Sequence, residues 1–376
     1  MGVRRCGKSV ILLQIIDELK AKGIPDSQII YINFEYEDFS FIQNDTDLHN
    51  YIKNLIVNDD KYYLFFDEIQ NVEHWEKAVN SFKASKNVSI FITGSNSDLL
   101  SGELATHIAG RYVSFKTFPF TFKEVCKLKN LTAQNDIEKA FDDYITWGGL
   151  PQRFMLTDEM QTKTYLSDVY DSILLKDIVS RFNIKDIDLF NRIVEYIVTT
   201  PSQNFSAGNL ANYFANKDNR EVSKNTLYNY LDYMSKAMLI NKADRYDVRG
   251  KRILTGKYKY YLTDLGFDQI MSIGKRPQLG AYLENIVYNE LLSRGYDVKV
   301  GNLDNGEIDF IATNFDEKIY IQVAYILADD SVVEREFGAF KSIQDNYPKY
   351  VLTLDKFDFS HDGIIHKNVI NWLLEK

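Results

Sequence analysis

Two stretches of the sequence carry residue types suited to phosphate chemistry. Residues 2–9 read Gly-Val-Arg-Arg-Cys-Gly-Lys-Ser and satisfy the pattern G-x-x-x-x-G-K-[ST]. In this pattern backbone N–H groups hold phosphates, the lysine contacts the β and γ phosphates, and the serine hydroxyl binds Mg²⁺. We therefore predict a loop that binds ATP and Mg²⁺. The residues expected to contact the nucleotide are Gly2, Arg4, Arg5, Cys6, Gly7, Lys8, Ser9 and Val10.

A pair of carboxylates further along the chain supplies the rest of this chemistry. In the stretch LFFDEIQ an apolar run ends abruptly in Asp67 and Glu68. We expect Asp67 to hold Mg²⁺ together with Ser9, and Glu68 to orient and polarise an attacking water while Lys8 faces the phosphates. The alternative is that the two acids only end a strand in solvent. The complete loop upstream argues against that alternative.

Two further positions allow a catalytic and a structural interpretation. Ser95 and Asn96, in ITGSNS, lie at the end of a predicted strand, where they would either sense the γ-phosphate or help orient water, or else form a turn. Arg111, in IAGRYVSF, would serve either as an arginine finger across an interface between copies of the chain or as a surface ion-pair partner.

Strands and helices alternate around these residues. The pattern predicts a helix over 9–22 with Val10, Leu13, Ile16 and Leu19 on its buried face, closed by Gly23 and Pro25. It also predicts strands at 28–37, 61–70, 87–97 and 111–120. Such alternation is typical of a parallel sheet covered on both faces, which binds ligands at the carboxyl ends of its strands.

The strand that normally precedes a phosphate-binding loop is not present in the sequence, because only Met1 comes before Gly2. We therefore expect that the chain is an N-terminally shortened version of a longer protein.

The middle of the chain changes character twice. Residues 126–200 have helical periodicity, interrupted by YITWGGLP, and we expect a helical lid. Residues 201–270 show two short helices followed by two strands, a winged-helix pattern. The basic residues of the expected wing are Lys242, Arg245, Arg249, Lys251, Arg252, Lys257 and Lys259. Through Arg249, Lys251 and Arg252 this segment would contact DNA; alternatively it is a lid or a protein contact.

The last segment, 276–376, resembles the PD-(D/E)-x-K nucleases. Glu284 lies in a predicted helix and Asp309 in the stretch GEIDFIA, but Gln322 and Ala324 stand where such a nuclease has an acid and a lysine. Clustered carboxylates hold Mg²⁺ in these enzymes, and the lysine activates the nucleophile. We expect a degenerate site that keeps the fold and lacks nuclease activity.

Composition is that of an ordinary globular protein. The chain has 376 residues, of which 45% are hydrophobic and 26% charged, with a net charge of −9. No apolar run approaches the roughly 18 residues of a membrane helix. We expect a cytoplasmic protein that does not contact membranes, and the two cysteines suggest no metal site or disulfide framework.

The motifs together resemble a prokaryotic group of AAA-type ATP-binding proteins with a C-terminal restriction-endonuclease-like domain. The stretches that carry the resemblance are GVRRCGKS, LFFDEIQ, ITGSNSDLLS, AGRYVSFKTFPFTFKE and WGGLP. The expected fold is α/β: a P-loop core at 1–125, the helical lid, the winged helix and an α/β nuclease-like domain.

The resemblance implies nucleotide-driven switching. Our first hypothesis is an ATPase whose C-terminal domain binds an unidentified protein partner; the sequence leaves the oligomeric state open, homo-oligomers included. A DNA-processing or nuclease effector is one alternative. An interaction protein with a vestigial nucleotide pocket is the other.

Overall fold

The structure is a computed structural model that describes residues 1–95, 112–250, 252–272, 278–303, 306–315 and 317–375, with only the backbone of 255–257. It contains two compact units. The first comprises Met1–Thr117 and Lys236–Met238, and the second comprises Phe118–Ser235 and Leu239–Lys376. None of the helices in these ranges is both long and apolar enough to cross a membrane.

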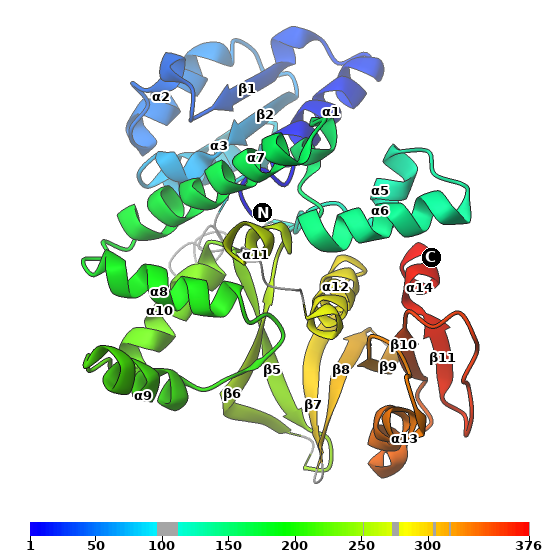
Figure 1. Cartoon of the computed structure of the whole chain (residues 1–376). Coiled ribbons are helices and arrows are strands. Elements are labelled where there is room, and N and C mark those ends of the chain that lie inside the picture. Colours follow the sequence, from blue (N-terminus) through cyan, green and yellow to red (C-terminus); the bar gives the residue numbers. More distant parts are fainter. Residues whose placement is uncertain (96–111, 251, 273–277, 304–305, 316, 376) are drawn as a thin grey trace. The chain divides into compact units, whose positions relative to one another are not determined.

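A parallel sheet forms the centre of the first unit (Figure 1). Its described strands lie in the order β1 (Ile29–Asn33), β2 (Tyr62–Asp67) and β3 (Val88–Ile92). Ile29 pairs with Tyr63, and Tyr62 pairs with Val88. Because β2 is apolar on both faces, it is stable only under cover on both sides, as is usual for parallel strands.

Helices provide that cover. On one face α1 (Lys8–Ala21) places Leu12 and Ile16 against Phe65. On the other, α2 (Asp45–Leu55) and α3 (Trp75–Ser85) pack against Leu64 and Phe66. The expected buried face of α1 was partly wrong, because Val10 and Leu13 are exposed. The run VILLQII is apolar nearly all round, so its spacing alone does not select a face.

The strand expected at 111–120 is absent from its described residues, 112–120. Two backbone hydrogen bonds to Met1 are found there instead. The Met1 ammonium donates to the Phe115 carbonyl at 2.7 Å, and the Thr117 N–H donates to the Met1 carbonyl at 2.6 Å. A strand needs a ladder of such bonds along its length, and one residue supplies a single rung.

The second unit begins with helices. They are α5 (Phe122–Leu128), α6 (Gln134–Trp147), α7 (Glu159–Ser172), which continues as a π-helix (Ile173–Ser180), and α8 (Ile187–Val198). Thr121 and Glu124 form a capping box that fixes the start of α5. After α6 the chain turns at Gly148 and Gly149 into a 3₁₀ helix (Pro151–Met155).

The next elements follow the order α8, β4 (Asn204–Phe205), α9 (Ala207–Asp218), α10 (Lys224–Lys236), β5 (Ile240–Asp247) and β6 (Arg252–Leu262). Strand β6 pairs antiparallel with both β4 and β5. The serine side chain of Ser206 caps α9 by accepting the Asn209 N–H.

The remaining elements extend the same sheet. They are α11 (Gly266–Met271), α12 (Leu279–Ser293), β7 (Asp297–Leu303), β8 (Gly306–Asn314), β9 (Glu317–Val323), α13 (Asp330–Gly338), β10 (Lys349–Thr353), β11 (Ile365–Asn368) and α14 (Val369–Leu374). The strand order is β11-β10-β9-β8-β7-β5-β6-β4. Strand β5 pairs parallel with β7 through residues 245–247. The expected wing and the C-terminal strands therefore share one eight-stranded sheet (Figure 1).

Candidate functional site

The phosphate-binding loop leads directly into α1. Gly7 takes a left-handed conformation, with φ of 98°, immediately before the helix begins at Lys8. At Gly2 a Cβ would lie 2.4 Å from the Thr117 carbonyl oxygen and 2.5 Å from Cys6 Sγ, so only glycine fits. No acidic residue lies in the first turn of α1. The N–H groups of this turn and the helix dipole therefore favour a bound anion.

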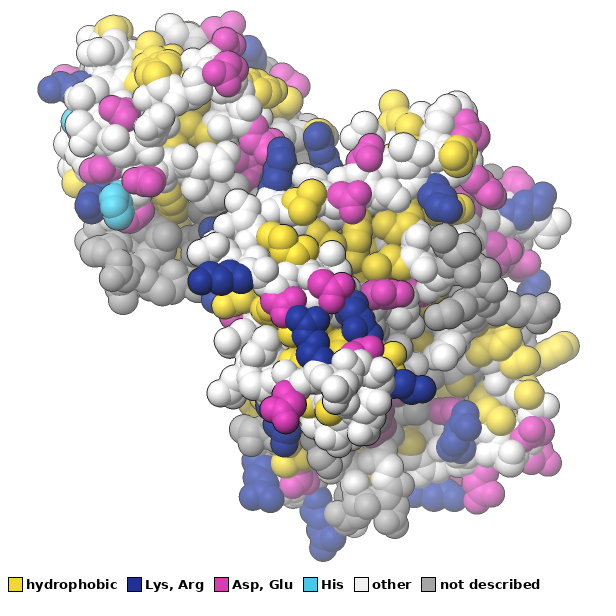
Figure 2. All heavy atoms as spheres, turned by 60° about the vertical axis from the view of Figure 1, so that its left-hand side comes forward, with side chains coloured by type: hydrophobic (Ala, Val, Ile, Leu, Met, Phe, Trp, Pro, Cys, Tyr) yellow, Lys and Arg dark blue, Asp and Glu magenta, His cyan; other side chains and the backbone are white. Residues whose placement is uncertain are grey.

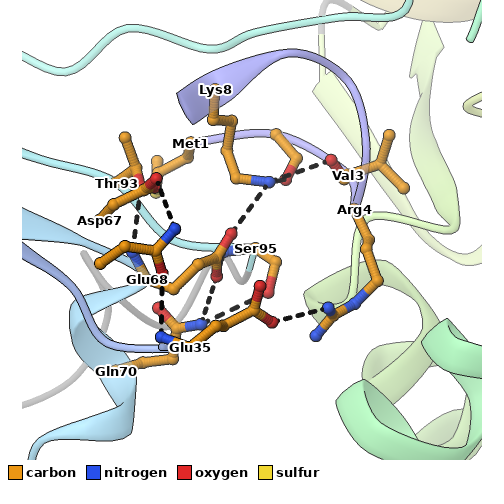
Figure 3. Close-up of polar contacts among 12 residues, drawn as sticks. Met1, Val3, Arg4, Lys8, Glu35, Asp67, Glu68, Gln70, Thr93 and Ser95 are labelled. Carbon is orange, nitrogen blue, oxygen red and sulfur yellow. Dashed lines mark hydrogen bonds and ion pairs between the residues drawn. The ribbon is translucent and has the colours of Figure 1, made fainter. Parts of the chain in front are cut away.

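Lys8 is buried beside the loop and directed at its backbone (Figure 3). Its Nζ donates to the carbonyl oxygens of Gly2 and Val3, each at 3.1 Å, and lies 3.5 Å from Glu68 Oε1. A buried ammonium is stable only when such acceptors surround it. The contacts hold the lysine in the place where it would meet phosphate oxygens.

Asp67, the last residue of β2, is fully buried among hydroxyl and amide donors. Tyr31 OH donates to its Oδ2 at 2.9 Å, Asn33 Nδ2 donates to the same oxygen at 3.3 Å, and the Thr93 hydroxyl donates to Oδ1. Burial, together with Asp67, raises the pKa of Tyr31. Two of the donors belong to β1 and the third directly follows β3, so both neighbouring strands fix the carboxylate.

Glu68 points the other way, toward Lys8 (Figure 3). Its backbone is left-handed, with φ of 54°, and its N–H donates to Thr93 Oγ1 at 3.1 Å. Burial alone would raise the pKa of Glu68, but Lys8 and the amide of Gln70 outweigh it and the pKa lies below its usual value. The side chain is therefore an ionised carboxylate next to the loop, as a general base requires.

The remaining predicted residues of this site lie in several environments. Ser9 is half-buried in the first turn of α1, and Val10 and Arg5 are exposed. Arg4 pairs with Glu35 at 2.9 Å. Cys6 is buried, and burial raises the pKa of its thiol. Ser95 contacts Glu68 through its backbone N–H at 3.2 Å. Asn96 and Arg111 lie outside the described residues.

Four residues that fix the carboxylates were not predicted from the sequence: Tyr31, Asn33, Gln70 and Thr93. Asn33 is the last residue of β1 and Thr93 directly follows β3, whereas the predicted strands, 28–37 and 87–97, extended beyond both residues. The polar residue that follows each apolar run was a usable signal for the true strand ends. Gln70 follows Glu68 in DEIQ, and its role depends on a turn that brings its amide back to Glu68.

The C-terminal candidates do come together. Glu284 on α12 and Asp309 on β8 lie on either side of Lys259, a residue of β6. Its Nζ is 3.0 Å from Glu284 Oε1, 2.6 Å from Glu307 Oε1 and 3.9 Å from Asp309 Oδ1. Gln322 Oε1 accepts the Asp309 N–H at 3.2 Å, and Ala324 is buried.

This carboxylate–lysine cluster, consisting of Lys259, Glu284, Glu307 and Asp309, corrects the interpretation of the basic segment. Lys259 and Arg245 were counted with the wing, yet both are buried, and Arg245 pairs with Glu307. Burial and the nearby Glu284 raise the pKa of Asp309 well above its usual value. In the described part of the chain, no group of three or more His, Cys, Asp or Glu side chains could hold a metal ion.

Comparison with known proteins gives two family matches. A model of an AAA domain matches residues 1–126, and a model of a domain of unknown function, DUF8612, matches residues 138–273. An uncharacterized protein of Haemophilus influenzae is 39% identical over 378 residues, which cover 100% of this chain and 93% of that protein. The uncharacterized protein MJ1544 of Methanocaldococcus jannaschii is 35% identical over 358 residues, 92% of this chain and 78% of that protein.

Two solved structures show weak similarity. A Walker-type ATPase of Pyrococcus abyssi has a TM-score of 0.47 at 15% identity, covering 72% of this chain and 89% of that one. An ORC1 protein of Aeropyrum pernix, solved in complex with DNA, has a TM-score of 0.32 at 10% identity, covering 73% and 85%. These scores are too low for either structure to bear on the function of this chain.

A phosphate-binding loop, a buried lysine and a carboxylate pair at the end of a central parallel strand are the parts of a P-loop nucleotide-binding domain. With the family match over 1–126, they identify the first unit as an AAA domain of the P-loop type. The whole chain belongs to the family that includes the H. influenzae protein and MJ1544.

Proposed function

We propose that the protein binds ATP with Mg²⁺, hydrolyses it, and uses the nucleotide state as a switch. The observation that carries the proposal is that the two buried carboxylates have different partners. Asp67 is held by Tyr31, Asn33 and Thr93, whereas Glu68 faces Lys8 beside the loop. A site that only ended a strand in solvent would leave both acids exposed, and here both are buried.

The residues of the chain have separate tasks in this reaction. Lys8 would exchange its contacts with Gly2, Val3 and Glu68 for oxygens of the β and γ phosphates. Ser9 and Asp67 would hold Mg²⁺, for which a hydroxyl and a carboxylate are suitable oxygen ligands. Bound Mg²⁺ neutralises charge that develops on the phosphates. Glu68, released from Lys8, accepts a proton from the water that attacks the γ-phosphorus as the bond to ADP breaks.

Two variants test this proposal. Lys8→Ala should weaken ATP binding about tenfold or more, because it removes the fixed cation that faces the phosphates.

Glu68→Gln should leave ATP binding within about twofold and lower phosphate release by about 100-fold or more, because an amide cannot accept the proton. Calorimetry measures binding, and a phosphate-release assay on the full chain measures turnover. Glu73→Gln, at an exposed carboxylate nearby, is the matched control. Parental turnover by Glu68→Gln would refute the assigned role.

We further propose that 276–376 keeps a PD-(D/E)-x-K-like fold and recognises a protein partner instead of cutting nucleic acid. The order α12, β7, β8, β9, α13, β10, with antiparallel β7-β8-β9 and parallel β9-β10, supports the fold. Lys259 pairs with Glu284 at 3.0 Å and lies 3.9 Å from Asp309, the two carboxylates that a nuclease would use for metal, and this supports inactivity.

DNA contact is a second candidate function. The order α8, β4, α9, α10, β5, β6 supports a winged helix, with Lys224, Asn225 and Asn229 exposed on α10. Arg249 and Arg252 are exposed at the β5–β6 turn, and Lys251 lies outside the described residues. On the face shown in Figure 2, basic and acidic side chains are interspersed. A face of mixed charge is not the continuous basic surface that strong nonspecific DNA binding requires. Any DNA binding by this segment should therefore be weak and sensitive to salt.

An electrophoretic shift assay at low and moderate salt tests this candidate. Changing Arg249, Lys251 and Arg252 together to Ala should weaken DNA binding about tenfold or more at low salt and flatten its salt dependence. Lys163→Ala, at an exposed lysine of α7, should have no effect. DNA binding that is absent, or unchanged in the triple variant, would exclude this contact.

A further inference from the structure

Gln70 is a residue of the nucleotide site to which the mechanism above gives no role. It lies in the 3₁₀ turn Ile69–Asn71, directly after the carboxylate pair. The turn brings its amide back to Glu68 (Figure 3). Gln70 Nε2 lies 2.5 Å from Glu68 Oε2 and 3.5 Å from Ser95 Oγ.

The amide makes the two oxygens of Glu68 unequal. Oε2 accepts hydrogen bonds from Gln70 Nε2 and from the Ser95 N–H, whereas Oε1 faces Lys8. Two donors on one oxygen fix the plane of the carboxylate, and Oε1 is thereby directed at Lys8 and the phosphate-binding loop. With Gln70 removed, a single backbone N–H would remain on Oε2, and the carboxylate would be free to rotate about its terminal bond.

The carbonyl oxygen of the same amide takes no part in these contacts. Gln70 Oε1 is buried and accepts no hydrogen bond from the described residues. The amide cannot turn round to relieve this, because its carbonyl oxygen would then face the Glu68 carboxylate. A buried acceptor without a donor is costly, so it marks a place where a hydrogen-bond donor binds. A water molecule is the smallest donor that satisfies it, beside the carboxylate that is to act as base.

We propose that Gln70 is a positioning residue for ATP hydrolysis, which holds Glu68 toward the loop through Nε2 and accepts a hydrogen bond from the attacking water through Oε1. The inference rests on the ATP hydrolysis proposed above. The water oxygen forms the new bond to the γ-phosphorus, the bond from that phosphorus to the bridging oxygen of ADP breaks, and Glu68 takes the proton. Gln70 stays neutral and transfers no proton.

The test is Gln70→Ala, measured for ATP affinity, for kcat and for the pH dependence of kcat on the full chain. We expect affinity within about twofold of the parent and kcat lowered about 10- to 100-fold, because the base and water lose their orientation. The acid limb of the kcat profile should move to higher pH, because Glu68 loses a donor that lowers its pKa. A purely structural role for Gln70 would not move that limb.

Asn71→Ala is the matched control, since Asn71 is in the same turn and its amide donates to the Phe34 carbonyl at an exposed site. It should leave kcat and its pH profile unchanged. Gln70→Glu should be slower still, because a second carboxylate beside Glu68 raises the pKa of the base. If the parent releases phosphate and Gln70→Ala keeps both its kcat and its acid limb, the positioning role is wrong. A parent that releases no phosphate overturns the proposed function itself.

Discussion

Lys259→Met should destabilise the second unit by about 3–5 kcal/mol, the cost of leaving buried carboxylates without their cation. Lys259 Nζ is shared by Glu284, Glu307 and Asp309, and 5% of its side chain is exposed. Methionine keeps the length and apolar stem of lysine, so the loss reports the charge and its hydrogen bonds. Denaturant unfolding followed by tryptophan fluorescence or circular dichroism measures the change in free energy.

The pH dependence gives this prediction a second test. Without Lys259 the folded-state pKa values of Glu284 and Asp309, already raised by burial, rise further. The folded variant then binds more protons than its unfolded chain, so its deficit relative to the parent should shrink as the pH falls from neutral toward about 5. For the same reason Lys259→Met with Glu284→Gln should recover part of the loss.

Lys242→Met is the control, because Lys242 also lies in this sheet and pairs with Asp244 at 3.3 Å, but both side chains are about 40% exposed. An exposed pair contributes at most about 1 kcal/mol. Equal losses for Lys242→Met and Lys259→Met would contradict the assignment of Lys259 as the shared cation.

The parts of the site that sequence predicted are those fixed by local chemistry. The loop of residues 2–9 must have glycine at two places and Lys-Ser at the start of a helix, so its pattern can be recognised from the sequence alone. The apolar strand that ends in Asp67 and Glu68 can be recognised in the same way. These predictions needed no knowledge of which strands are neighbours.

The partners of Asp67 required that knowledge. Tyr31 and Asn33 come from β1, and Thr93 follows β3. They meet Asp67 only because β2 lies between those two strands. A sequence shows that a strand ends in a polar residue, but not which strand ends beside it.

Lys259 shows a second limit of prediction from sequence, because its burial was not expected. In the stretch KYKYYL two lysines alternate with two tyrosines, a strand pattern that predicts lysine on the solvent face, and lysine is seldom buried unless it is paired. In the structure Tyr260 and Tyr261, which point to opposite faces of β6, are both buried, so neither face of the strand is open to solvent at Lys259. The three carboxylates that pair it lie on α12 and β8, later in the chain, and only the tertiary fold brings them to Lys259 on β6.

The stretch WGGLP was predicted to interrupt the helical segment, and the structure shows why both glycines are required. Gly148 has φ of 76°, and a Cβ there would lie 1.7 Å from Asp264 Oδ1. At Gly149 a Cβ would lie 2.3 Å from the Phe120 carbonyl oxygen. The turn thus brings the backbone against a buried carboxylate that comes more than a hundred residues later, a contact no local pattern contains.

Gly148→Ala should therefore destabilise the second unit by about 3–5 kcal/mol. Asp264 is buried and accepts the N–H groups of Gly149 at 2.7 Å and Gly266 at 2.9 Å. A methyl group at 148 must displace this carboxylate, which leaves those two N–H groups unpaired at about 1–3 kcal/mol each. The left-handed backbone adds strain for any residue with a Cβ. Denaturant unfolding measures the loss, and the nucleotide affinity of the first unit is not expected to change.

Two comparisons separate the clash from a general loss of glycine. Gly280→Ala, in the first turn of α12 where a Cβ would meet nothing within 4 Å, should be neutral or gain up to about 1 kcal/mol. Asp264→Ala alone should cost stability, because two buried N–H groups lose their acceptor. Gly148→Ala combined with Asp264→Ala should cost clearly less than the sum of the single changes, because the displaced carboxylate is gone. Strict additivity, or a Gly148→Ala protein as stable as Gly280→Ala, would show that the close approach of Asp264 does not fix this turn.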